Sequence, residues 1–164
     1  GAGLQMFSHG VMTALFFAVV GMVYDQAHTR DLPKLGGFAK AMPLVAVAFI
    51  IGGLVSMGMP GLSGFIAEFP IFMGLWQTQP IVALVVVISI VVTAAYIMRI
   101  IGRVFFGAMP VELDGHVGDV ILQDKVALVL LSGILILVGI YPAVMAPMVQ
   151  NGADAILRLI GAGS

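Results

Sequence analysis

Residues 43–76 form a run of 34 residues that carries one charged side chain, the carboxylate of Glu68. A straight helix of that length would reach about 50 Å, whereas the hydrocarbon core of a membrane is about 30 Å thick. Four residues that weaken or break helices are clustered at positions 58–64 of the run, namely Gly58, Pro60, Gly61 and Gly64. The run therefore predicts a membrane span that is broken near Pro60.

The composition of the whole chain is typical of a membrane protein. Hydrophobic residues make up 61% and charged residues 9%, against about 25% charged residues in soluble domains. Apolar runs of roughly 20 residues match transmembrane helices. We therefore expect an all-α fold, a polytopic helix bundle of about four spans that contacts the lipid bilayer.

The same composition excludes several functions. The net charge is -1 and the chain has no run of basic residues, so no nucleic-acid partner is expected. Because the chain has no cysteine, it can form neither a thiolate metal site nor an iron–sulfur cluster. No other metal-ligand cluster and no phosphate-binding motif is recognisable in the sequence. We therefore expect neither a metal site nor a cofactor site in this chain.

Loops and breakers divide the chain into the expected spans of a single membrane domain over residues 1–164. The expected spans are residues 4–24, 43–76 (broken), 81–103 and 123–141, joined by loops over 25–40 and 107–125 and by a short turn at 77–80. Residues 143–164 are expected to form a tail, divided by Pro147, Asn151 and Gly152, or an interfacial helix over 153–160. The sequence opens inside an apolar stretch with no basic region before it, so we expect the C-terminal part of a longer protein.

Basic residues predict how the spans are oriented. With four spans, the loops over 25–40 and 107–125 lie on one side of the membrane. Six of the seven lysines and arginines fall in or beside these two loops, and only Arg158 lies opposite. The positive-inside rule makes the loop side cytoplasmic. Both chain ends would then face outward.

Glu68 is the main candidate for chemistry. A carboxylate at membrane depth is costly and usually marks an ion or proton route. Burial favours its neutral form, whereas a half-helix that starts near Leu62 or Ser63 favours the anion only within the first turn. Two interpretations remain open: proton transfer by Glu68, with the broken helix as a gate, or a static hydrogen bond to a neighbouring helix.

His9 is the second candidate, because it is the titratable residue of the first span. Ser8 and Thr13 lie beside it and one turn later, and Ser63 adds a further polar group near the break. An imidazole can pass protons through either ring nitrogen. The alternative is a neutral histidine that binds a backbone carbonyl between two helices.

Three segments together resemble one known family. They are SHGVMTALFFAVVGMVYDQAHTRDLPKLGG, GLVSMGMPGLSGFIAEFPIFMG and YIMRIIGRVFFG. They resemble the C-terminal third of subunit M, also called subunit 4, an antiporter-like membrane subunit of NADH:quinone oxidoreductase (respiratory complex I). The resemblance covers residues 8–107, and the fourth span is compatible with it but not specific.

The resemblance implies roles for the candidate residues. The family's subunit has fourteen spans, of which this chain would supply the last four. Glu68 would be the glutamate of the broken twelfth span, at the outward end of a polar axis, and His9 the histidine of the eleventh. The sister L and N subunits carry a lysine where Glu68 stands, which favours subunit M. The family's other charged groups belong to the upstream part.

The function implied is proton translocation as a non-redox part of an NADH:quinone oxidoreductase, with this chain forming the outward half of a channel. Flavin, iron–sulfur clusters and quinone would then be bound by partner subunits. Partners would include the N-terminal part of the same subunit and the L- and N-type sisters. We expect a bacterial plasma membrane before a mitochondrial or thylakoid one. The alternatives are a cation/proton antiporter, a membrane-bound hydrogenase subunit, and a purely structural segment.

Overall fold

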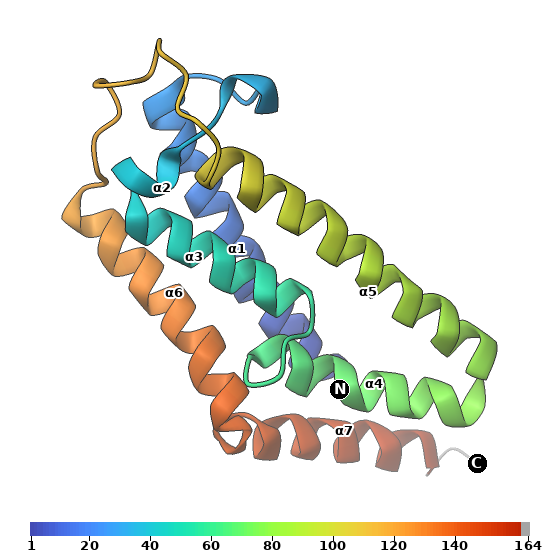
Figure 1. Ribbon diagram of the computed structural model, residues 1–164. Coiled ribbons are helices and arrows are strands. Elements are labelled where there is room, and N and C mark those ends of the chain that lie inside the picture. Colours follow the sequence, from blue (N-terminus) through green and yellow to red (C-terminus); the bar gives the residue numbers. More distant parts are fainter. Residues whose placement is uncertain (162–164) are drawn as a thin grey trace.

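The computed structural model describes residues 1–161, and this part of the chain folds into helices and loops without a strand (Figure 1). Two short elements follow the first helix: a one-turn helix at Leu32–Lys34 and α2 at Phe38–Ala41. The long helices are α1 (Ala2–Ala27), α3 (Pro43–Ser56), α4 (Ser63–Thr78), α5 (Pro80–Ile100), α6 (Leu122–Ile140) and α7 (Ala146–Gly161).

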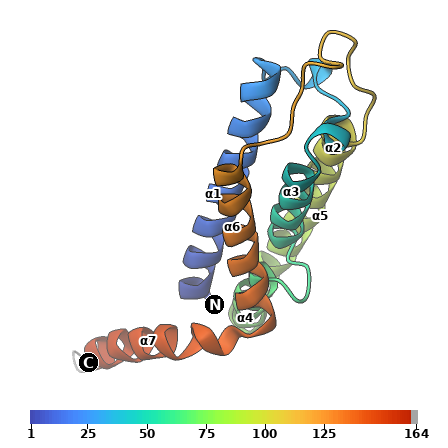
Figure 2. The same cartoon turned by 90° about the vertical axis from the view of Figure 1, so that its left-hand side faces the viewer.

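Helices α1, α3, α5 and α6 run between the same two ends of the molecule, while α4 and α7 lie at one of these ends, beside both termini (Figures 1 and 2). Helix α1 packs against α3, α4 and α6. Leu15, Val45, Leu128 and Leu135 are fully buried where α1, α3 and α6 meet. In a bilayer these contacts stabilise the bundle through close van der Waals packing, because lipid chains are as apolar as the buried side chains.

Within residues 1–161, three helices are long and apolar enough to cross a membrane. They are α1, α6, and α5 together with the π-helical turn Ile101–Phe105 that continues it. Helix α3 is equally apolar but has only 14 residues. The predicted polytopic bundle with a discontinuous second span is therefore confirmed, and α3 and α4 are the two parts of that span.

The break between α3 and α4 begins with a Schellman motif. Gly58 has a φ of 65°, its N–H donates to the carbonyl of Val55, and the N–H of Met59 donates to the carbonyl of Leu54. This pattern ends a helix and requires a left-handed residue, which glycine supplies without a steric penalty. Gly61, with a φ of 91°, then turns the chain into α4.

Glycines let other backbone segments lie close to the break. A Cβ atom on Gly139 of α6 would overlap the backbone of Gly61 and Leu62. A Cβ atom on Gly64 would overlap the carbonyl oxygen of Val55. The discontinuous span is therefore held by direct backbone packing against α6 and between its own two halves.

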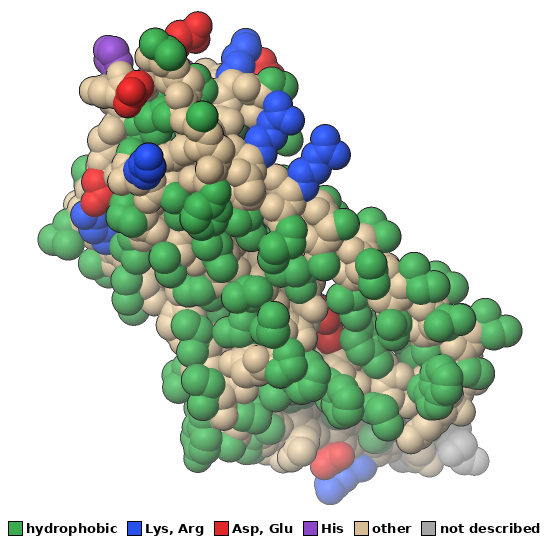
Figure 3. Space-filling model, in the orientation of Figure 1, with side chains coloured by type: hydrophobic (Ala, Val, Ile, Leu, Met, Phe, Trp, Pro, Cys, Tyr) green, Lys and Arg blue, Asp and Glu red, His purple; other side chains and the backbone are tan. Residues whose placement is uncertain are grey.

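The two polar loops meet at the end of the bundle opposite the termini. The N–H of Gly118 donates to Oε1 of Gln26 at 3.0 Å, and a Cβ atom on Gly36 would overlap the carbonyl oxygen of Ala108. Figure 3 shows basic and acidic side chains gathered at this end, above a largely apolar surface. The expectation that both loops share one end is thus confirmed.

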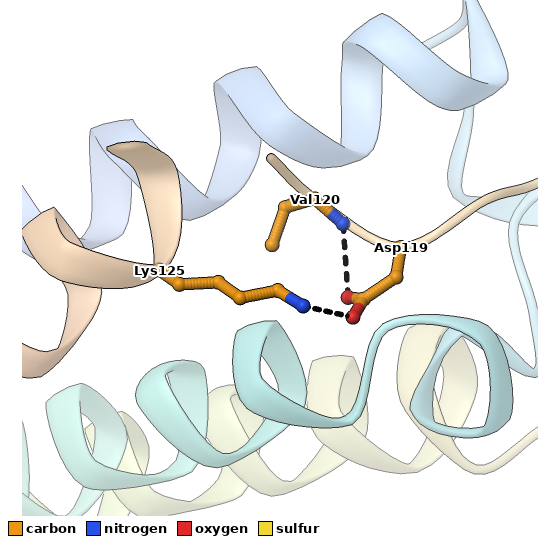
Figure 4. A network of polar contacts seen from close by, with 3 residues as sticks. All are labelled: Asp119, Val120 and Lys125. Atoms are coloured by element: carbon orange, nitrogen blue, oxygen red, sulfur yellow. Dashed lines mark hydrogen bonds and ion pairs between the residues drawn. The ribbon is translucent and has the colours of Figure 1, made fainter. Parts of the chain in front are cut away.

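An ion pair fixes the start of α6. Asp119 accepts hydrogen bonds from Nζ of Lys125 and from the backbone N–H of Val120 (Figure 4). The hydrogen bond from Lys125, followed by that from Val120, holds the pKa of Asp119 below its usual range. Because this group is exposed, the pair orders the loop rather than adding much stability.

The tail differs from its prediction. Helix α7 is continuous from Ala146 to Gly161, so Asn151 and Gly152 do not divide it. Pro147 is accommodated in the first turn, where its missing N–H costs nothing. The interfacial helix expected over 153–160 is therefore part of a longer amphipathic helix, and residues 162–164 of the expected tail lie outside the described residues.

The turn expected at residues 77–80 is also shorter than predicted. Helix α4 continues to Thr78 and α5 begins at Pro80, so Gln79 alone separates them. Proline suits the first turn of α5 for the same reason as in α7.

Candidate functional site

Glu68 lies in the second turn of α4 and is half-buried. The amide nitrogen Nε2 of Gln5, on α1, donates a hydrogen bond to Oε1 of Glu68 at 3.3 Å. A side chain from one helix therefore binds the carboxylate of another. This contact partly offsets the cost of removing the carboxylate from water.

The second carboxylate oxygen of Glu68 lies against Gly58 in the helix break. A Cβ atom on Gly58 would lie 2.7 Å from Oε2 of Glu68, which is closer than real Cβ contacts come. Gly58 thus has two functions: it adopts the left-handed conformation that ends α3, and it leaves room for the carboxylate.

Two serines connect α1 to the first residue of α4. The hydroxyl oxygens of Ser8 and Ser63 are 2.8 Å apart and both residues are buried. A buried hydroxyl pair satisfies two polar groups that would otherwise be costly. The pair fixes the start of α4 against α1, close to the Gln5–Glu68 contact.

His9 is exposed on α1, and its Nε2 is 3.4 Å from Oγ1 of Thr13, four residues later on the same helix. Within residues 1–161 no hydrogen bond joins His9 to Glu68. The two side chains instead line the same cavity, of about 420 Å³, between α1, α3, α4 and α5. Its other polar lining groups include Gln5, Ser56, Thr13 and Tyr96.

A second cavity, of about 240 Å³, lies on another side of Glu68. Helix α5 supplies Ser89 and Thr93 to its wall, and Ile71 and Phe72 of α4 also line it. Gln5, Ser56 and Glu68 line both cavities. Glu68 and its hydrogen-bond partner therefore stand between two spaces, each of which has polar side chains on its wall.

The predicted candidate residues fall into two groups in space. The first group lies where α1 packs on the helix break and consists of Glu68, Gly58, Ser8 and Ser63. The second group, on the wall of the larger cavity, consists of His9 and Thr13. Three more shape the break without a hydrogen bond to the carboxylate: Pro60, Gly61 and Gly64. Their functional roles stay predictions.

Gln5 is the residue that the sequence analysis missed. It lies four residues before His9, which places both on one face of α1. A glutamine among apolar residues on the face of a histidine was the available signal. Tyr96 was missed as well, because nothing in the sequence indicates that α5 places it on the wall of the cavity that Glu68 lines.

The described residues contain no group of three or more His, Asp or Glu side chains that could hold a metal ion. The two cavities carry hydroxyl, imidazole and carboxyl groups, which can exchange or relay protons, together with the amide of Gln5. The arrangement of these groups therefore suits proton movement.

Comparison with known proteins identifies the family. The family model described as NADH:quinone oxidoreductase/Mrp antiporter, TM, matches residues 1–93. The chain is 33% identical over 149 residues to NADH-quinone oxidoreductase subunit M of Rhodobacter capsulatus, covering 91% of this chain and 29% of that protein. It is 39% identical over 152 residues to NAD(P)H-quinone oxidoreductase chain 4 of a Synechococcus species, covering 87% and 29%.

A solved structure gives the same result. Respiratory complex I from Thermus thermophilus contains a chain that matches with a TM-score of 0.74 and 29% identity, covering 82% of this chain and 28% of that one. The sequence-based resemblance to subunit M is thus confirmed, and the chain spans less than a third of the length of these relatives. The chain belongs to the NADH:quinone oxidoreductase/Mrp antiporter transmembrane family.

Proposed function

We propose that this chain is the C-terminal part of a proton-translocating membrane-arm subunit of an NADH:quinone oxidoreductase, and that Glu68 takes up and releases the proton. The observation that carries the proposal is the position of Glu68. Its carboxyl group lines two cavities, is bound by Gln5 and borders the helix break. Intramembrane acids in such surroundings mark proton routes.

The proposed path runs from the larger cavity to the smaller one. A proton reaches Glu68 across the space that His9 and Thr13 line. It leaves on the side lined by Ser89 and Thr93 of α5. Glu68 has to alternate between carboxylate and acid, and a small shift of α4 at the break around Gly58 and Gly61 can change which cavity its carboxyl group faces.

The remaining functions belong to partners in this proposal. The upstream part of the subunit brings protons from the cytoplasmic side, and the L- and N-type sister subunits pack beside it. Flavin, iron–sulfur clusters and quinone are bound by other subunits, so this chain is a non-redox component. The proposed location is a bacterial plasma membrane. The solved relative from Thermus thermophilus is part of respiratory complex I, which supports the presence of partner subunits in the membrane arm.

The proposal is tested with Glu68→Gln in the intact complex, by following NADH-driven proton pumping in inverted membrane vesicles. We expect pumping to fall roughly tenfold or more, because an amide does not exchange protons as a carboxyl group does. Glu112→Gln, which neutralises an exposed loop carboxylate, is the matched control and should pump normally. Normal pumping by Glu68→Gln would leave only a structural role for this segment.

The family description includes Mrp antiporters, so a cation/proton antiporter is the second candidate. The same carboxyl group between two cavities could exchange a proton for a cation. The dependence of proton movement on sodium separates the two candidate functions. Proton pumping that is driven by NADH in the absence of sodium supports the redox-driven proton pump. Proton movement that requires a sodium gradient and no electron donor would support the second.

A further inference from the structure

The side-chain amide of Gln5 makes a hydrogen bond through its nitrogen but none through its oxygen to any described residue. Its Nε2 donates to Glu68, whereas its Oε1 is buried and accepts no hydrogen bond from any residue between 1 and 161. A buried acceptor without a partner is costly, and such groups are rare in native structures. The unused acceptor lies on the same amide group as the nitrogen that binds the carboxylate.

A glutamine amide can hold either form of a carboxyl group. A carboxylate only accepts hydrogen bonds, and the Gln5 nitrogen supplies one. A protonated carboxyl group has an O–H that donates, and the amide oxygen can accept it after the amide rotates about its last side-chain bond. No covalent bond to Gln5 forms or breaks, and only the O–H bond of Glu68 is made and broken.

We propose that Gln5 is a positioning residue that holds the Glu68 carboxyl group in both of its protonation states, donating to the carboxylate and accepting from the acid. This inference deepens the proposed function and rests on it. Its consequence is that the change of charge does not by itself release the Glu68 side chain into either cavity, so that the cavity it faces is set by the shift of α4 at the break.

Gln5 is suited to this role because it is the side chain that hydrogen-bonds to Glu68 among the described residues, although the hydroxyl of Ser56 also lines both cavities. The other carboxyl oxygen of Glu68 lies against Gly58, which has no side chain to offer. His9 from α1 and Tyr96 from α5 are the titratable groups that share the larger cavity with Glu68. The parts of α3 and α6 that pack on α4 contribute no titratable or charged side chain to either cavity.

The test uses Gln5→Met in the intact complex. Methionine keeps the length and flexibility of the side chain and removes both the donor and the acceptor. The readout is the infrared band of the protonated carboxyl C=O group, assigned to Glu68 by its loss in Glu68→Gln. We expect this band to move to higher wavenumber in Gln5→Met, because the acid loses its hydrogen bond, and NADH-driven pumping per assembled complex to fall about tenfold.

Ser132→Ala is the matched control, because Oγ of Ser132 is also buried without a hydrogen-bond partner among the described residues but borders neither cavity. It should change neither the band nor pumping. Gln5→Glu, which keeps size and polarity, is the second variant if Gln5→Met lowers assembly. It should also reduce pumping, because two adjacent carboxyl groups share one proton.

An unshifted Glu68 band in Gln5→Met, or normal pumping by Gln5→Glu, overturns the role of Gln5. Failure of the underlying function has a different signature. In that case Glu68→Gln itself pumps normally, whereas failure of the Gln5 inference alone leaves Glu68→Gln inactive and the Gln5 variants active.

Discussion

Glu68 is held by a hydrogen bond from one helix and by space that another segment leaves open. Gln5 of α1 binds Oε1, and Gly58 in the break faces Oε2. The sequence indicates Glu68 as a candidate site residue, because a lone carboxylate in an apolar run is costly. Its partner Gln5 could not be predicted from the sequence, because the contact joins residues 63 positions apart and depends on how α1 and α4 pack.

Gly58→Ala should impair pumping by displacing the Glu68 carboxyl group. Alanine at a φ of 65° costs about 1–2 kcal/mol, and its Cβ would also press against Oε2 of Glu68. The measurements are the thermal stability of the purified complex and its NADH-driven proton pumping.

Gly61→Ala separates these two effects. Gly61 also has a positive φ, of 91°, but a Cβ atom there would meet no atom within 4 Å. We expect a comparable loss of stability with pumping retained. If Gly58→Ala and Gly61→Ala pump equally well, the close approach of Glu68 to Gly58 has no functional role.

At the scale of elements, the discontinuous span is the feature that shapes the site. The Schellman motif at Gly58 ends α3, the Ser8–Ser63 pair fixes the start of α4, and Gly139 lets α6 approach the connecting segment. The break itself was predictable from four helix-breaking residues in a run too long for the membrane. The continuity of α7 was not predictable in the same way, because Asn151 and Gly152 only weakly disfavour a helix and the amphipathic pattern outweighs them.

Gly139→Ala should destabilise the break. Its Cβ atom would overlap the backbone of Gly61 and Leu62, so α6 or the connecting segment has to move, at a cost of about 1–3 kcal/mol. Gly133→Ala on the same helix meets nothing within 4 Å and should be neutral or stabilising by up to about 1 kcal/mol. Thermal unfolding of the purified complex distinguishes them, and equal melting temperatures would contradict the packing described.

At the scale of the whole molecule, the two ends differ in charge. Six of the seven basic residues lie in or beside the two loops that meet at one end, and the N-terminus and α7 lie at the other (Figures 1 and 3). Loop placement followed from counting spans, because each span reverses the side of the chain. The arrangement of α4 and α5 around the second cavity could not be predicted from the sequence. It depends on the single-residue turn at Gln79 and on the direction that α4 takes after the break.

Cysteine labelling tests the predicted orientation, since the chain has no cysteine of its own. Glu112→Cys marks the loop end, and Asp154→Cys marks α7 at the opposite end; both residues are exposed. The positive-inside rule predicts that a membrane-impermeant maleimide labels Asp154→Cys in intact cells and Glu112→Cys only in inverted vesicles. The reverse pattern would mean that Glu68 lies at the cytoplasmic end of the path.

The central claim is that Glu68 changes its protonation state while the complex works. Its most direct test is the infrared difference spectrum of the intact complex, recorded before and after NADH is added, in the wild type and in Glu68→Gln. The account predicts a carboxyl C=O feature in the wild-type difference spectrum that is missing in Glu68→Gln. Identical carboxyl regions in the two spectra would show that Glu68 keeps one protonation state and would contradict the account.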